Sequence, residues 1–137
     1  FCHNPELVLI SSASLPAKKE DREKIEADFF QHLEKRKGQL EGVCITGGEP
    51  TVQSDLIEFI QKIKKMGYAV KLDTNGTHPE IVAKVIKEKL VDYIAMDIKN
   101  QIDRYDQATR VRQYKEQIKE SVKLIMQGGT PYEFRTT

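Results

Sequence analysis

Polar residues that could bind a small charged ligand follow four short apolar runs of the sequence. They form the segments Gly47-Gly48-Glu49-Pro50, Asp73-Thr74-Asn75-Gly76, Asp97-Ile98-Lys99 and Arg135-Thr136. A carboxylate such as Glu49 can accept hydrogen bonds from an ammonium group, whereas Lys99 or Arg135 can hold a carboxylate. The two glycines before Glu49 allow a ligand to approach the backbone closely. These residue types indicate a site for a small zwitterionic or phosphorylated ligand.

Each of these segments also has a simpler explanation when it is taken alone. Asp, Asn and Gly favour turns, so any one segment could merely end a strand. The Gly47-Gly48 pair matches neither the phosphate-binding Walker pattern nor the dinucleotide fingerprint, because the later glycines and the lysine–hydroxyl pair are missing. The functional interpretation depends on all four segments occurring where an apolar run stops.

The elements that must position these residues alternate between helix and strand. Apolar residues at helical spacing predict four helices: about 21–37 with Ile25, Phe29 and Leu33; about 55–66 with Leu56, Ile60 and Ile63; one from Pro79 with Ile81, Val82, Val85 and Ile86; and one that ends before Gly128, with Ile118, Val122 and Ile125. A polar loop at about 100–112 precedes the last helix, and short apolar runs predict strands at 42–46, 68–72, 91–96 and 132–137. Such alternation is typical of an α/β fold in which about four parallel strands alternate with helices. Because right-handed crossovers make the strands parallel, their carboxyl ends share one edge, where the polar segments would meet.

Composition excludes several classes of protein. The 137 residues are 39% hydrophobic and 31% charged, which is ordinary for a globular domain and argues against a disordered or fibrous chain. The net charge of +1 gives no reason to expect nucleic acid or a membrane as partner. Two cysteines without a secretion signal favour a reducing, cytoplasmic location, where an exposed cysteine is a candidate ligand or redox group.

The four segments, taken with the first residues, resemble a known family. Phe1-Cys2-His3-Asn4-Pro5 resembles the end of the C-x3-C-x-aromatic-C cysteine loop of radical S-adenosylmethionine enzymes, and Gly47-Gly48-Glu49-Pro50 resembles their GGEP motif. The Asp-Thr-Asn-Gly and Asp-x-Lys segments make the chain most similar to glycyl-radical-enzyme activases, of the anaerobic ribonucleotide reductase and pyruvate formate-lyase types. The resemblance extends over nearly the whole chain.

This resemblance implies a partial TIM-like (β/α)6 barrel. Residues 1–137 are then expected to be one core fragment, with the first strand and two further cluster cysteines upstream and the last strand downstream. Such a fragment alone is expected to be inactive, whereas the full-length protein is expected to be an enzyme.

The resemblance also implies roles for individual residues. Cys2 would be one of three thiolates on a [4Fe-4S] cluster, and Glu49, with the backbone of Gly47 and Gly48, would hold the ammonium group of S-adenosylmethionine. Phe1 would pack beside the adenine. The sulfonium, ribose and carboxylate would be lined by Asp73, Thr74, Asp97, Lys99 and Arg135. In some activases the equivalent acids also hold a monovalent cation.

The implied reaction is reductive cleavage of S-adenosylmethionine to a 5′-deoxyadenosyl radical, which removes a hydrogen atom from a glycine of a partner enzyme. The implied electron donor is a flavodoxin or ferredoxin. Two alternatives stay open: a radical enzyme acting on a small molecule, such as a 7-carboxy-7-deazaguanine synthase, and a degenerate domain that binds a ligand or protein without catalysis.

Cys44 and the three histidines lie outside the four polar segments. Cys44 lies between Val43 and Ile45 in a predicted strand, and we expect it to be a small core residue. His32 and His78 are expected to face solvent, and His3 is expected either near the cluster or at a frayed terminus.

Overall fold

The computed structural model describes residues 19–98 and 114–136, which divide into two compact units. The first described unit contains helix α2, Lys19–Lys35. Of its predicted apolar stripe, Leu33 is buried whereas Ile25 is 59% exposed.

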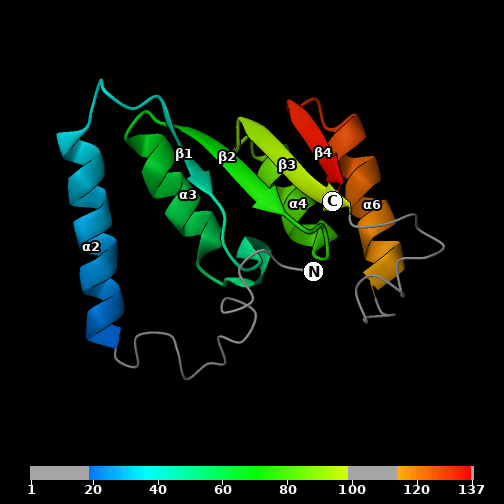
Figure 1. Ribbon diagram of the computed structural model, residues 1–137, viewed down its shortest axis with the longest axis horizontal. Helices are drawn as coiled ribbons and strands as arrows, with labels where there is room; N and C mark the ends of the chain where they lie inside the picture. The colour runs from blue at the N-terminus through cyan, green and yellow to red at the C-terminus, as the bar shows by residue number, and fades with distance from the viewer. Residues whose placement is uncertain (1–18, 99–113, 137) are drawn as a thin grey trace. The chain divides into compact units, whose positions relative to one another are not determined.

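The second unit, which begins at Gly42, alternates strands and helices as expected (Figure 1). Its elements are β1 (Gly42–Ile45), the 3₁₀ turn η1 (Pro50–Val52), α3 (Leu56–Lys65), β2 (Ala69–Thr74), α4 (Pro79–Lys87), β3 (Tyr93–Ile98), α6 (Lys115–Gln127) and β4 (Tyr132–Thr136). The predicted polar loop at 100–112 lies outside the described residues. None of the helices within 19–98 and 114–136 is long and apolar enough to cross a membrane.

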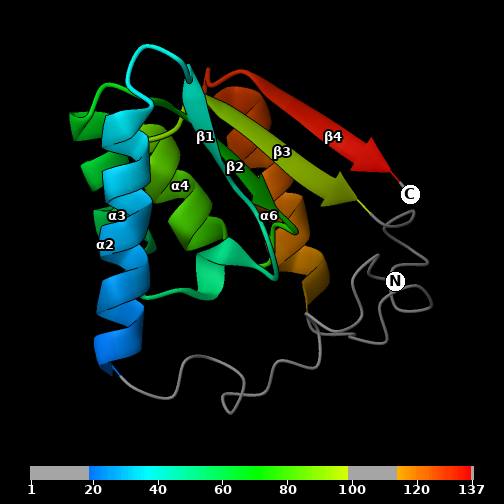
Figure 2. The ribbon, with the colours of Figure 1, turned by 60° about the vertical axis from the view of Figure 1, so that its left-hand side comes forward.

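The four strands form one parallel sheet in the order β1-β2-β3-β4. Helices α3, α4 and α6 all lie on the same face of this sheet (Figure 2), as right-handed crossovers between neighbouring parallel strands require. The predicted α/β class and strand direction are therefore confirmed.

The core lies between the sheet and its three helices. It is made by fully buried side chains from β2, β3 and all three helices: Ile60, Ile63, Val70, Leu72, Val82, Val85, Ile94, Met96 and Ile125. Because side chains alternate along a strand, β2 sends Val70, Leu72 and Thr74 into this core and turns Lys71 and Asp73 to the opposite face.

Two strands continue further than the sequence pattern predicted. Asp73 pairs with Ala95, Thr74 with Met96, and Asp97 with Arg135, so these polar residues end the strands instead of following them. Their backbone pairing continues because a polar side chain at the end of a strand does not prevent ladder hydrogen bonds.

The prediction that Cys44 is a core residue is wrong. It is exposed, because Val43 and Ile45 are the more buried residues of β1 and the two-residue period therefore turns Cys44 to the other face. Its apolar neighbours in sequence were a misleading signal.

Candidate functional site

The Glu49 carboxylate joins the loop after β1 to the end of β2. Its Oε1 accepts hydrogen bonds from Thr51 N at 3.2 Å, Thr51 Oγ1 at 2.5 Å and Thr74 Oγ1 at 2.7 Å. Its Oε2 accepts one, from Asn75 N at 2.7 Å. The predicted pair Glu49 and Thr74 is therefore in direct contact.

Gly47 and Gly48 leave the space beside this loop open. Gly47 has φ +121°, which a side chain would strain. A Cβ atom built on either glycine would meet no atom within 4 Å. The exposed backbone next to Glu49 is consequently accessible to a ligand.

A second group of polar side chains completes what we call the loop cluster: Glu49, Thr51, Thr74, Asn75, Thr77 and His78. The side-chain Oδ1 of Asn75 accepts from Thr77 N at 3.0 Å and from Thr77 Oγ1 at 2.7 Å. The Nδ1 of His78 lies 3.2 Å from Thr51 Oγ1 and 3.0 Å from Thr77 Oγ1. His78 is thus half-buried and hydrogen-bonded, contrary to the prediction that it faces solvent, whereas His32 is exposed as predicted.

Charged side chains form a second cluster on the face of the sheet opposite the helices. This sheet-face cluster consists of Lys71, Asp73, Asp97, Glu133 and Arg135. Arg135 donates from Nε to Asp97 at 3.0 Å and from Nη1 to Asp73 at 3.1 Å. Lys71 Nζ donates to Glu133 at 3.2 Å and lies 3.7 Å from Asp73 Oδ1. The predicted residues Asp73, Asp97 and Arg135 are therefore brought together.

In and beside the sheet-face cluster, partial burial and neighbouring charges both shift the pKa values of individual side chains. Partial burial opposes the charge of Arg135, but the bonds to Asp73 and Asp97 outweigh it and raise the pKa of Arg135 above its usual value. Partial burial and the nearby Asp73 carboxylate raise the pKa of the Cys44 thiol. Asp73 Oδ1 is buried and has no hydrogen-bond partner among the described residues, and the Lys71 ammonium lies 3.7 Å away, beyond hydrogen-bond distance.

The predicted constellation therefore divides into two parts. Thr74 and Asp73 are adjacent but point to opposite faces of β2, so Glu49 bonds to the first and Arg135 to the second. Phe1, Cys2 and Lys99 lie outside the described residues. The sequence prediction missed Thr51, Thr77 and His78, although their polar character beside two of the singled-out segments was a usable signal.

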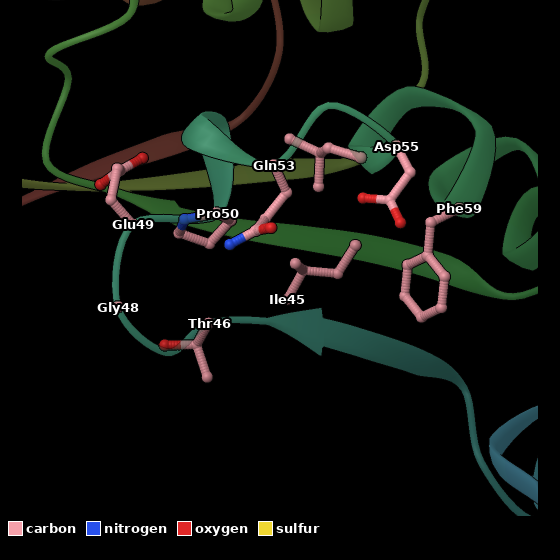
Figure 3. A pocket seen from close by; sticks show the side chains of 9 residues that line it. Ile45, Thr46, Gly48, Glu49, Pro50, Gln53, Asp55 and Phe59 are labelled. Carbon is pink, nitrogen blue, oxygen red and sulfur yellow. The ribbon is translucent and has the colours of Figure 1, made fainter. Parts of the chain in front are cut away.

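A pocket of about 310 Å³ lies behind the Glu49 loop, between β1 and the start of α3 (Figure 3). Ile45 and Phe59 form its apolar wall, and Gln53 and Asp55 add polar atoms. The Glu49 side chain is turned away from the rest of this lining in Figure 3, and its carboxylate is bonded to residues at the end of β2. Glu49 would therefore meet a ligand outside this pocket.

A solved structure has a similar fold. A structure of TYW1 with a lysine-pyruvate adduct bound matches with a TM-score of 0.57 and 18% identity over 83% of this chain and 42% of that one. This likeness supports the assignment of the sheet and helices to a partial TIM-like barrel.

Several proteins with assigned names are similar to this chain in sequence. A Methanocaldococcus jannaschii protein named a glycyl-radical enzyme activating enzyme is 44% identical over 63% of this chain and 36% of its own length. The pyruvate formate-lyase-activating enzyme of Listeria monocytogenes is 32% identical over 72% of this chain and 41% of its own. A 7-carboxy-7-deazaguanine synthase of Thermococcus kodakarensis is 35% identical over 47% and 25%. The matches span less than half of the length of each relative.

One family model covers the chain from its first residue to its last. The model is that of the radical SAM superfamily, and it matches residues 1–137. The chain therefore belongs to the radical SAM superfamily.

Proposed function

We propose that this chain binds S-adenosylmethionine at the carboxyl edge of its sheet and forms the core of an enzyme that generates a glycyl radical on a partner protein. The superfamily uses S-adenosylmethionine together with a [4Fe-4S] cluster. The observation that carries the binding proposal is the Glu49 carboxylate, fixed beside the open Gly47-Gly48 backbone.

The loop cluster fits the ammonium group of an amino acid. Glu49 Oε2 accepts one hydrogen bond, from Asn75 N, and a carboxylate oxygen can accept a second. An ammonium group placed over Gly47 and Gly48 would reach this oxygen and the neighbouring backbone carbonyls. The loop would therefore bind the methionine end of the ligand and orient it.

The sheet-face cluster fits the other polar parts of the ligand. Within residues 19–98 and 114–136, the buried Asp73 Oδ1 accepts no hydrogen bond and has the Lys71 ammonium 3.7 Å away, so a ribose hydroxyl or a monovalent ion would satisfy it. Arg135 uses two of its five N–H groups on Asp73 and Asp97, so others remain for a ligand carboxylate. Asp97 and Lys99 are assigned to the same side of the ligand, whereas Thr74, on the opposite face of β2, would act through its bond to Glu49.

The cluster ligands belong to the start of the chain. Within the described ranges 19–98 and 114–136, no group of three or more His, Cys, Asp or Glu residues could hold a metal ion. Cys2 is the proposed ligand, together with two cysteines upstream of it, and Phe1 is the proposed neighbour of the adenine. When bound, the cluster supplies one electron to S-adenosylmethionine.

Sequence similarity supports the finer assignment to a glycyl-radical activase. Two relatives named as activating enzymes match 63% and 72% of this chain. The partner would then be a glycyl radical enzyme, and a flavodoxin or ferredoxin would supply the electron.

The full-length reconstituted protein, mixed anaerobically with a co-expressed glycyl radical enzyme, reductant and S-adenosylmethionine, tests this assignment. We expect a glycyl-radical signal in the electron paramagnetic resonance spectrum of the partner. Reactions without S-adenosylmethionine, and reactions with a partner whose radical glycine is changed to alanine, serve as controls. Failure to form the radical while S-adenosylmethionine is cleaved would contradict the activase assignment.

A second candidate function is supported by the deazaguanine synthase relatives, which match 47% and 42% of the chain. In that case the same S-adenosylmethionine site would serve a small-molecule substrate. Formation of 7-carboxy-7-deazaguanine in a reconstituted assay, measured by mass spectrometry, would favour this candidate over the activase.

A further inference from the structure

His78 belongs to the loop cluster but is not one of the residues assigned to the ligand. It occupies the position before Pro79, at the start of α4, and its side chain makes no capping bond to that helix. Its Nδ1 instead lies within hydrogen-bond distance of two threonine hydroxyls, Thr51 after β1 and Thr77 after β2. The ring therefore connects two separate loops.

The contacts of Thr77 with Asn75 determine which way the hydroxyl proton of Thr77 points. The backbone N–H of Thr77 can only donate, so the Asn75 atom that it contacts must be the carbonyl oxygen. That oxygen also lies 2.7 Å from the Thr77 hydroxyl, which must give it its one proton. Thr77 Oγ1 can consequently offer only a lone pair to His78 Nδ1.

Thr51 leads independently to the same conclusion. Its hydroxyl lies 2.5 Å from Glu49 Oε1, and a carboxylate oxygen accepts, so the hydroxyl proton points at Glu49. Thr51 Oγ1 likewise has only a lone pair left for the imidazole. Both contacts require a proton on Nδ1.

We propose that His78 is a positioning residue whose ring is protonated on Nδ1 and donates to Thr51 and Thr77 together. By donating to a lone pair of Thr51 Oγ1, the ring holds Thr51 in the position from which its proton points at Glu49, and it ties the Glu49 loop to the start of α4. Its effect on ligand binding rests on the proposed function of Glu49, whereas the protonation of the ring does not.

The proton position is measurable directly. Long-range ¹H–¹⁵N correlation spectra of the full-length protein with labelled histidine distinguish the two ring nitrogens, and loss of the signal in His78→Asn assigns it. We expect Nδ1 to carry the proton at a pH where the ring is neutral, which is the less common form of free histidine. A neutral ring protonated on Nε2 would overturn the proposal.

Substitutions of His78 measure how its ring affects the binding of S-adenosylmethionine. We expect His78→Leu to weaken S-adenosylmethionine binding about 3- to 10-fold, because the contacts of Nδ1 with Thr51 and Thr77 are both lost. His78→Asn places an amide N–H near the position of Nδ1 and should restore the affinity to within about 2-fold. The exposed His32 offers a matched control, since His32→Leu should leave the affinity unchanged.

A double-mutant cycle with Thr51→Val separates positioning from general stability. If His78 acts through Thr51, His78→Leu has little further effect once the Thr51 hydroxyl is absent. Unchanged affinity in His78→Leu, or full additivity in the cycle, would contradict the proposal. If wild-type protein binds no S-adenosylmethionine, the proposed function is wrong, and the ring spectra alone decide the His78 inference.

Discussion

Glu49 is the residue on which the proposed binding site depends most. Its two carboxylate oxygens receive four hydrogen bonds from two loops, and a carboxylate is the only side chain of this size whose two oxygens both accept. The geometry therefore explains why an acid, and not its amide, follows the two glycines.

Glu49→Gln tests this role. A glutamine that keeps its carbonyl toward Thr51 and Thr74 must turn its NH₂ toward the N–H of Asn75, so two donors would face each other. We expect the dissociation constant for S-adenosylmethionine to rise at least about tenfold, measured by anaerobic calorimetry. The exposed Glu80→Gln on α4 is the matched control. Equal affinities for both variants would remove the role assigned to Glu49.

Cys44 provides a second test at this scale. Because partial burial and the Asp73 carboxylate raise its pKa, the thiol is protonated over a wider pH range than a free cysteine. We expect iodoacetamide to modify Cys44 more slowly than a free cysteine at pH 8, and Asp73→Asn to speed this modification. Peptide mass spectrometry would locate the label, and faster alkylation of the wild-type thiol would contradict this electrostatic account.

At the scale of elements, the turn between β2 and α4 places the loop cluster. Gly76 has φ +74°, and a Cβ there would lie 2.9 Å from Met96 Sδ in the core. The Gly76 carbonyl also accepts from the buried Ser121 of α6 at 2.8 Å. The Asn75-Gly76 turn is thereby packed against both β3 and α6.

Gly76→Ala should destabilise the fold by about 2–4 kcal/mol, because positive φ and a steric clash act together. Gly67→Ala separates the two causes: Gly67 has φ +89° but open space around it, so we expect a loss of only about 1 kcal/mol. Urea denaturation of both variants gives the comparison. Equal losses would show that the contact with Met96 has no effect.

Asp92 joins three elements just before β3. It accepts from Lys64 of α3 at 2.7 Å and from the Val70 backbone of β2 at 2.7 Å. Burial is the largest single influence and opposes its charge, but these bonds and the Lys64 charge outweigh it and lower the pKa of Asp92. Asp92 therefore favours the folded state above its unfolded pKa, and this contribution is lost as the pH falls through the folded value.

Asp92→Asn should lower the free energy of unfolding by about 1 kcal/mol at pH 7, after allowing for solvent screening of this half-exposed pair. The difference from wild type should shrink as the pH falls through the lowered pKa of Asp92. Denaturation curves of both proteins at a series of pH values measure this difference in the free energy of unfolding. A difference that is constant from pH 7 to pH 3 would contradict the electrostatic explanation.

Sequence periodicity was sufficient to predict the alternating helices and parallel strands and the buried faces of α3, α4 and α6, but not that of α2, where Ile25 is exposed. The stripe of Leu56, Ile60 and Ile63 is buried as expected, because helical spacing alone determines which residues share a face. Cys44 was misplaced because a four-residue strand offers too few positions to reveal its alternation. The bonds of His78 could not be predicted, since they depend on how two loops from different strands meet in space.

At the scale of the whole molecule, the edge where the parallel strands end carries the proposed chemistry. The helix-covered face of the sheet is apolar, whereas the opposite face bears Lys71, Asp73, Asp97, Glu133 and Arg135. A sheet with one such polar face suits a barrel whose interior binds a polar ligand.

Production of 5′-deoxyadenosine tests the central claim most directly. The full-length protein would be reconstituted anaerobically with iron and sulfide, reduced in the presence of S-adenosylmethionine, and assayed by chromatography against a control without enzyme. We predict 5′-deoxyadenosine above that control, with much less from Glu49→Gln than from Glu80→Gln. No 5′-deoxyadenosine above the control would contradict the account.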